Sequence, residues 1–189
     1  MESGPEAFFE WVKYRSHLSR GVTIGTMLQD EALRFIRLGT FLERADNTAR
    51  ILEVKYLNLL PGAEDDAHSA DYYQWSALLH SVSAFEVYRK VFRDQITPLR
   101  VAELLILRAD MPRSLARCLK EVYSNLTRVA NTRSAETERL AGELESHLHF
   151  GRIERIFEGG MRKFLEEFRD SIFDLGCRIS DDFLIPASA

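Results

Sequence analysis

Three charged side chains have the spacing of one helix face and could together bind or process a charged group. Glu43, Asp46 and Arg50 follow one another at steps of three and four residues, which places them on one stripe of an α-helix. Two carboxylates and a guanidinium could supply acid–base groups and a holder for a substrate carboxylate. The same stripe could instead dock a protein partner or form ion pairs across a helix interface, and ion pairs are the default interpretation.

The segment that carries these charges has the apolar pattern of an amphipathic helix over about residues 29–60. Apolar residues recur at alternating steps of three and four, namely Phe35, Leu38, Leu42, Ala45, Ala49, Leu52, Tyr56 and Leu59, which is a helical seam. Arg37 and Arg44 point to the side opposite the Glu43 stripe. Because one helix presents charge on two faces, we expect it to lie between neighbouring helices or between the protein and a partner.

A second charged cluster precedes a predicted helix start. Arg108, Asp110 and Arg113 lie together in sequence, and a helix N-terminus favours anions. One interpretation is an Asp cap with an arginine partner, which is the more common arrangement. The other is a site for an anion or a carboxylate.

The sequence predicts neither a metal site nor a cofactor. Ferritin-like di-iron bundles need Glu-x-x-His on facing helices, and this spacing does not occur in the chain. Both nucleotide-binding glycine loops are also absent. The two cysteines, Cys118 and Cys177, are far apart and lie in apolar helical patterns, so we expect buried free thiols rather than a zinc or redox motif.

Composition indicates an ordinary globular chain that forms one domain over residues 1–189. Hydrophobic residues make up 46% and charged residues 29% of the chain, and the net charge is −4. This balance argues against a nucleic-acid partner bound through overall positive charge. The N-terminus lacks the pattern of a signal peptide, and no apolar run could span a bilayer, so we expect a cytoplasmic location and no membrane partner.

The periodicity is helical almost throughout, which predicts an all-α fold: a single bundle of about seven helices, several of them long. Residues 19–28, which contain Gly21 and Gly25, are expected to form a loop, as is the acidic segment 63–70. The long helix is expected to stop at Pro61–Gly62, and a single helix is expected over residues 71–94. Gly159–Gly160 is expected to break or bend the last helix.

Several motifs together resemble one known family. The stretch from Arg37 to Arg50, with Glu43-Arg44 at its centre, resembles the signature of the bacterial alpha-E domain family, a predicted helical family named for its Glu-Arg motif. The likeness continues through residues 73–79, 81–86, 101–108 and 110–115. Family members are usually longer, and this chain is similar to their C-terminal half. An absent half would expose an apolar face, so we expect a homodimer or another form of self-association.

The resemblance implies which proteins act together with this chain rather than a reaction that it catalyses. Proteins of this family are typically encoded or fused with a circularly permuted ATP-grasp protein and a transglutaminase-like protein, and ATP-grasp enzymes form amide bonds. The resemblance therefore implies a role in a peptide-forming or peptide-processing system and identifies no catalytic residue. Glu43, Arg44, Asp46 and Arg50 match the signature and are carried over as candidate functional positions.

Three functional hypotheses follow from the sequence. The first is a non-enzymatic helical module that docks on an ATP-grasp amide ligase through the Glu43–Arg50 helix. The second is a peptide-binding or catalytic subunit, in which Glu43 and Asp46 act as acid–base groups and Arg50 or Arg108 holds a substrate carboxylate. The third is a purely structural helical module, in which all these charges form closed ion pairs.

Overall fold

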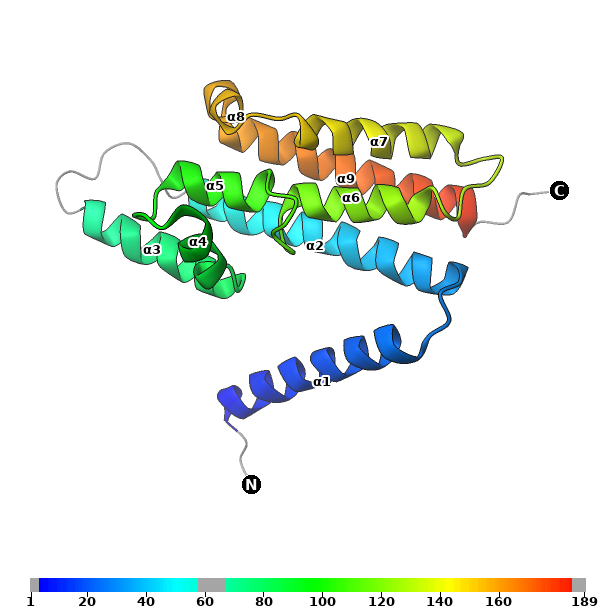
Figure 1. The fold of residues 1–189 in the computed structure, drawn as a ribbon, viewed down its shortest axis with the longest axis horizontal. Coiled ribbons are helices and arrows are strands. Elements are labelled where there is room, and N and C mark those ends of the chain that lie inside the picture. Colours follow the sequence, from blue (N-terminus) through cyan, green and yellow to red (C-terminus); the bar gives the residue numbers. More distant parts are fainter. Residues whose placement is uncertain (1–3, 58–66, 185–189) are drawn as a thin grey trace.

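A computed structural model describes residues 4–57 and 67–184, and within these ranges the chain forms helices and no strands (Figure 1). The all-α prediction is therefore confirmed, although the described residues form nine helices rather than about seven. The helices are α1 (Pro5–Thr26), α2 (Glu31–Leu57), α3 (Ala67–Ser81), α4 (Phe85–Phe92), α5 (Pro98–Ile106), α6 (Leu115–Leu126), α7 (Ala135–His149), α8 (Ile153–Gly159) and α9 (Met161–Phe183).

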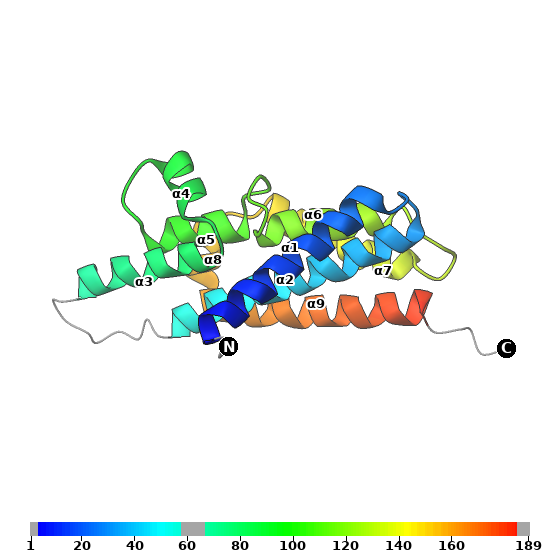
Figure 2. The ribbon, with the colours of Figure 1, turned by 90° about the horizontal axis from the view of Figure 1, so that it is seen from below.

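Helix α2 is the central element of the bundle. It packs against α6 on one flank and against α9 on the other, and α7 lies over α6 and α9 (Figures 1 and 2). The predicted apolar seam of α2 faces this core, and Leu38, Ala45, Ala49 and Leu52 are fully buried. Because two of these side chains are only methyl groups, the neighbouring helices can approach the α2 backbone closely.

The shorter helices α3, α4 and α5 cover the C-terminal end of α2. Trp75 of α3 is buried there, with its ring 5.2 Å from that of Tyr56. The Tyr56 hydroxyl donates a hydrogen bond to the Pro98 carbonyl at 3.0 Å. The Tyr88 hydroxyl similarly donates to the Gln95 carbonyl at 2.8 Å. These bonds satisfy the polar ends of large rings in the core.

Two predicted element boundaries are wrong. Helix α1 continues through Gly21 and Gly25 to Thr26, because an isolated glycine costs a helix only about 1 kcal/mol and no proline follows. The single helix expected over residues 71–94 is broken instead into α3 and α4. Ser83 has a φ of 55°, a left-handed conformation that ends α3.

The expected loop over residues 63–70 is also wrong in part, because α3 begins at Ala67. Residues 63–66 and the predicted stop at Pro61–Gly62 lie outside the described residues. The break at Gly159–Gly160 is confirmed. Gly160 has a φ of 96°, a backbone conformation that residues other than glycine rarely adopt. It turns the chain from α8 into α9.

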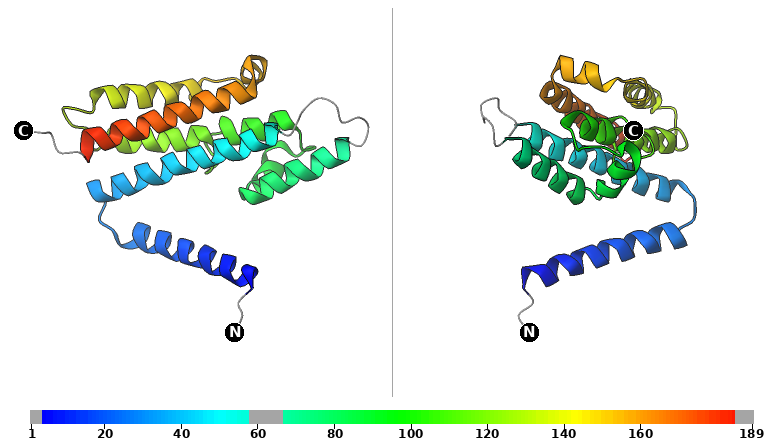
Figure 3. Two further views of the ribbon diagram at one scale, coloured as in Figure 1. Left: turned by 180° about the vertical axis from the view of Figure 1, so that it is seen from behind. Right: turned by 60° about the vertical axis from the view of Figure 1, so that its left-hand side comes forward.

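Helix α1 stands apart from the bundle. It has no buried residue, and it diverges from α2 toward its own N-terminus (Figures 1 and 3). Seen from below, it crosses the outer side of α2, the side that faces away from α6 and α9 (Figure 2). The segment between residues 27 and 30 that joins α1 to α2 begins with Met27 in an extended conformation.

The Gly160 turn generates a stability prediction. Replacing Gly160 by Ala should lower the free energy of unfolding by about 1–2 kcal/mol, because the new Cβ disfavours the positive φ. Gly159→Ala is the matched control, since a Cβ at Gly159 meets no atom within 4 Å. Urea unfolding followed by circular dichroism measures both variants. Equal stability of the two variants would contradict the assigned conformation of Gly160.

Candidate functional site

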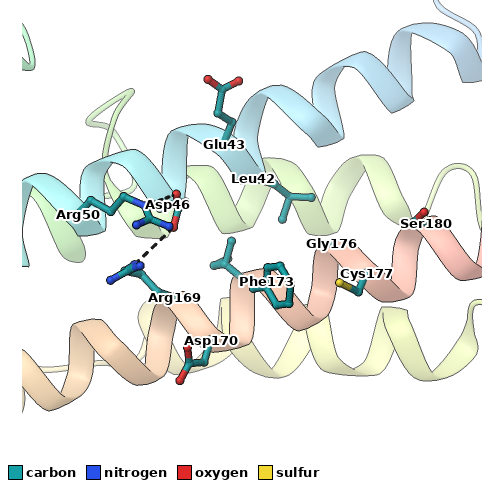
Figure 4. A pocket seen from close by; sticks show the side chains of 11 residues that line it. Leu42, Glu43, Asp46, Arg50, Arg169, Asp170, Phe173, Gly176, Cys177 and Ser180 are labelled. Carbon is teal, nitrogen blue, oxygen red and sulfur yellow. Dashed lines mark hydrogen bonds and ion pairs between the residues drawn. The ribbon is translucent and has the colours of Figure 1, made fainter.

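The charged stripe of α2 contacts α9 through an ion-pair network. Arg50 Nε lies 2.7 Å from Asp46 Oδ2, within α2. Arg169 of α9 reaches back to the same helix, with Nε 3.5 Å from Asp46 Oδ1 and Nη1 2.5 Å from Glu53 Oε2 (Figure 4). The hydrogen bond that Arg50 donates to Asp46 also raises the pKa of the Arg50 guanidinium above its ordinary value. Four charges on two helices therefore neutralise one another, as the ion-pair interpretation predicts.

A groove runs beside this network between α2 and α9. It has a volume of about 620 Å³, and its wall includes Leu42 from α2 and Phe173, Gly176 and Cys177 from α9 (Figure 4). Phe173 is 75% exposed, which is unusual for a large apolar ring on a packed helix. The groove therefore combines an exposed apolar wall with fixed charges at one end.

Glu43 differs from the rest of the stripe. It lies at the rim of the groove, and its carboxylate points away from Arg50 and Arg169 (Figure 4). Among the described residues, no hydrogen bond or ion pair engages this carboxylate. Of the two carboxylates that the sequence placed on one stripe, only Asp46 belongs to the ion-pair network.

The opposite flank of α2 forms an ion pair with α6. Arg37 Nη2 lies 2.7 Å from Glu121 Oε2, and Arg117 Nη2 lies 2.6 Å from the other oxygen of the same carboxylate. The Glu121 side chain is only 14% exposed, so its charge needs these partners. The predicted position of α2, with charge on two faces and a neighbouring helix on each, is confirmed.

Arg44 holds the loop that leads into α6. Its Nη1 donates a hydrogen bond to the Pro112 carbonyl at 3.3 Å, and its guanidinium lies 5.1 Å from the centre of the Phe41 ring. One turn further along α2, the Thr48 hydroxyl donates to the Arg113 carbonyl at 2.9 Å. Burial lowers the pKa of the Arg44 guanidinium, and the nearby positive charges of Arg20 and Arg113 lower it further.

The second predicted cluster forms a local ion pair within the loop. Arg108 Nε and Nη2 lie 2.9 and 2.5 Å from the two carboxylate oxygens of Asp110, and this contact lowers the pKa of the Asp110 carboxyl. The N-cap of α6 is Ser114 rather than Asp110, because the Ser114 hydroxyl accepts the Arg117 N–H at 3.0 Å. Arg113 is exposed.

The structure thus distributes the candidate residues over separate places. Asp46 and Arg50 lie together facing α9, Arg37 faces α6, and Arg44 supports the loop. Arg108 and Asp110 pair with each other, and no described contact joins Arg108 to Arg50. Sequence reasoning missed Arg169 and Glu121, which complete the two networks. The sequence carried a signal for Arg169. It lies directly beside the apolar seam of its helix, after Phe168 and before Ile172.

The two cysteines differ in burial, and the described acidic side chains do not gather into a metal site. In the part of the chain that the structure describes, no three His, Cys, Asp or Glu side chains gather closely enough to hold a metal ion. Cys118 is buried, and burial raises the pKa of its thiol to about 12. Cys177 is exposed, so the expectation of two buried thiols is wrong for this residue. No helix over the described ranges has the length and apolar character needed to cross a membrane.

The fold and the site together define a class of protein: an all-α bundle whose central helix forms ion pairs with both neighbouring helices. The family model named Alpha-E, described as a predicted alpha-helical domain with a conserved ER motif, matches residues 1–184. The chain therefore belongs to the Alpha-E family, and the resemblance drawn from its motifs is confirmed. Correspondence to a C-terminal half stays a prediction.

Glu-Arg pairs occur at residues 43–44, 138–139 and 154–155. The first of these pairs lies in the segment that carries the resemblance. Searches of curated proteins and of solved structures found no match.

Removing Arg169 should destabilise the protein. Arg169→Met leaves the Glu53 carboxylate, whose side chain is 15% exposed, without its partner, and should lower the free energy of unfolding by about 1–3 kcal/mol. Arg162→Met is the control. Its ion pair with Glu166 has side chains 65% and 46% exposed, so no measurable change is expected. A similar loss in both variants would contradict the assigned network.

The two thiols should differ sharply in reactivity. A water-soluble disulfide reagent at pH 8 should label one thiol per native chain, because the raised pKa and the burial of Cys118 keep it protonated and inaccessible. Cys177→Ser should abolish native labelling, whereas Cys118→Ser should leave it unchanged. Unfolding in guanidinium should expose the second thiol of the wild-type chain. Rapid labelling of two native thiols would show that Cys118 is not buried.

Proposed function

We propose that this Alpha-E protein is a cytoplasmic, non-enzymatic accessory subunit that docks on an ATP-grasp amide ligase. The observation that carries the proposal is the groove between α2 and α9, where the exposed Phe173 lies beside the fixed charges of Asp46, Arg50 and Arg169. An exposed aromatic anchor next to a polar rim is the usual anatomy of a protein-binding surface. The type of partner rests on the family resemblance.

The state of the carboxylates favours docking over catalysis. A general acid or base must be free to exchange a proton with a substrate. Asp46 is instead held between Arg50 and Arg169, and Glu43 points away from both arginines (Figure 4). These groups therefore do not converge on one reacting atom.

A second candidate function rests on the size of the groove. Its volume of about 620 Å³ lies within the range of small-molecule sites. A short peptide could place its carboxylate against Arg50 and an apolar side chain against Phe173. This chain would then be the peptide-binding subunit of the same system, with the ligase or the transglutaminase-like protein as its neighbour.

The docking proposal is tested by titrating a purified circularly permuted ATP-grasp protein, the kind of partner that the resemblance implies, with the wild type and two variants in a calorimeter. Phe173→Asp should weaken binding by about tenfold or more, because it places a charge in the buried centre of the interface. Phe150→Asp is the matched control. Phe150 is 80% exposed and lies outside the groove, so binding should not change.

Glu43→Ala extends this test to the family motif. Its carboxylate has no described partner, so the variant should unfold with the stability of the wild type while binding the ligase more weakly. No binding by the wild-type chain at micromolar concentrations would contradict the docking proposal. Equal affinity of all variants would show that the ligase uses another surface. Saturable binding of small peptides to the free chain, lost in Arg50→Ala, would favour the peptide-binding function instead.

A further inference from the structure

Helix α1 exposes an unusually large apolar surface. Eight of its large apolar side chains are between 40% and 65% exposed, namely Phe8, Phe9, Trp11, Val12, Tyr14, Leu18, Val22 and Ile24. Most helical stability in proteins comes from packing of an apolar face rather than from helix propensity. A helix of 22 residues with none of them buried therefore requires a surface that covers it.

The main apolar stripe of α1 does not face its own α2. Trp11, Leu18 and Val22 are spaced by seven and four residues and lie along one face of the helix. Thr23 is half-buried at the end of α1 nearest to α2, and it points about 120° away from the centre of that stripe. The stripe is therefore directed toward space that the other described residues of the chain do not occupy.

The outer face of α2 is the second uncovered surface. Ile36, Ile51 and Val54 are 44%, 37% and 61% exposed, and Glu43 lies between them without a described partner. The two surfaces match in length, since Ile36 to Val54 spans about 27 Å and Phe8 to Val22 about 21 Å at 1.5 Å per residue. The two helices that carry these surfaces are joined by the turn at residues 27–30 and diverge from it (Figures 1 and 3).

The charges of the two surfaces are complementary. Arg15 lies near the middle of the α1 stripe, with its guanidinium 5.6 Å from the centre of the Trp11 ring. No carboxylate among the described residues pairs with it, whereas the neighbouring Lys13 already pairs with Glu10 at 2.8 Å. Among the described residues, an arginine without an ion pair is thus central on one surface, and a carboxylate without an ion pair is central on the other.

We propose that two copies of this chain form a symmetric dimer, in which α1 of each copy packs against the outer face of α2 of the other. Arg15 of one copy then pairs with Glu43 of the second copy, which gives the Glu-Arg helix of the family a role in assembly. At roughly 100 Å² for each of the three stripe and three α2 side chains, one copy offers about 600 Å², and the two copies together about 1,200 Å², the lower end of the range for stable complexes. A second copy covers both surfaces at once, because the same contact occurs twice about a two-fold axis.

The first test measures molar mass by light scattering during size-exclusion chromatography. The wild type should elute with twice the 21.8 kDa mass of the chain. Arg15→Glu and Glu43→Arg should each weaken dimerisation by about tenfold or more, because each places like charges together, and the double variant should recover most of the affinity. Lys163→Glu, at a side chain of α9 that is 73% exposed, should leave the mass unchanged.

The second test separates this dimer from its alternatives. Leu18→Glu and Ile51→Glu should each give monomers whose bundle helices persist by circular dichroism. A monomeric wild type would overturn the proposal, whether α1 then folds onto its own α2 or is covered by a foreign protein. A dimer that survives both substitutions would also overturn it, because the copies would then meet through another face. Glu43 belongs to both tests, but Phe173 lies outside the dimer contact. Phe173→Asp should therefore stay dimeric while it loses ligase binding, which distinguishes failure of one proposal from failure of the other.

Discussion

The simultaneous contact of α2 with α6 and α9 is the constraint on which the rest of the structure depends. Ala45 and Ala49 are fully buried, and such small side chains let neighbouring backbones approach closely. Close approach also removes water from the charges that flank the seam, and charges without water must find partners. Glu121 supplies one for Arg37, and Arg169 supplies one for Glu53. The charge pattern of α2 is in this sense a consequence of its central position.

The same constraint explains which parts of the fold could be predicted. The three- and four-residue spacing in α2 identified a helix and its buried face, since Leu38 and Leu52 lie in the core. The boundaries depended on weaker, local preferences. Gly21 and Gly25 allow a helix as readily as a loop, and nothing in the residues around Ser83 signals its left-handed conformation. Such positions are decided by tertiary packing, which no local pattern records.

The candidate site, like the fold, was predicted only in part from the sequence. Helical spacing placed Asp46 and Arg50 on one stripe, and they form an ion pair. Spacing could not show that Glu43, a few tens of degrees further around the helix, would point away from the network, because the difference depends on where α9 lies. It also could not show that Arg44 would support a loop, since its acceptor at Pro112 is a backbone carbonyl that any residue could provide.

The ion pair between Glu53 and Arg169 joins residues that are 116 positions apart, and this separation affects how the chain folds during synthesis. A ribosome adds about 5–20 residues per second, so Glu53 in α2 is added roughly 6–23 s before Arg169 in the helix that covers its second flank. During this interval its apolar seam is only partly covered by α6. The last of the described helices to be made is thus the one that completes the core, and a nascent chain released before α9 would expose a surface prone to aggregation.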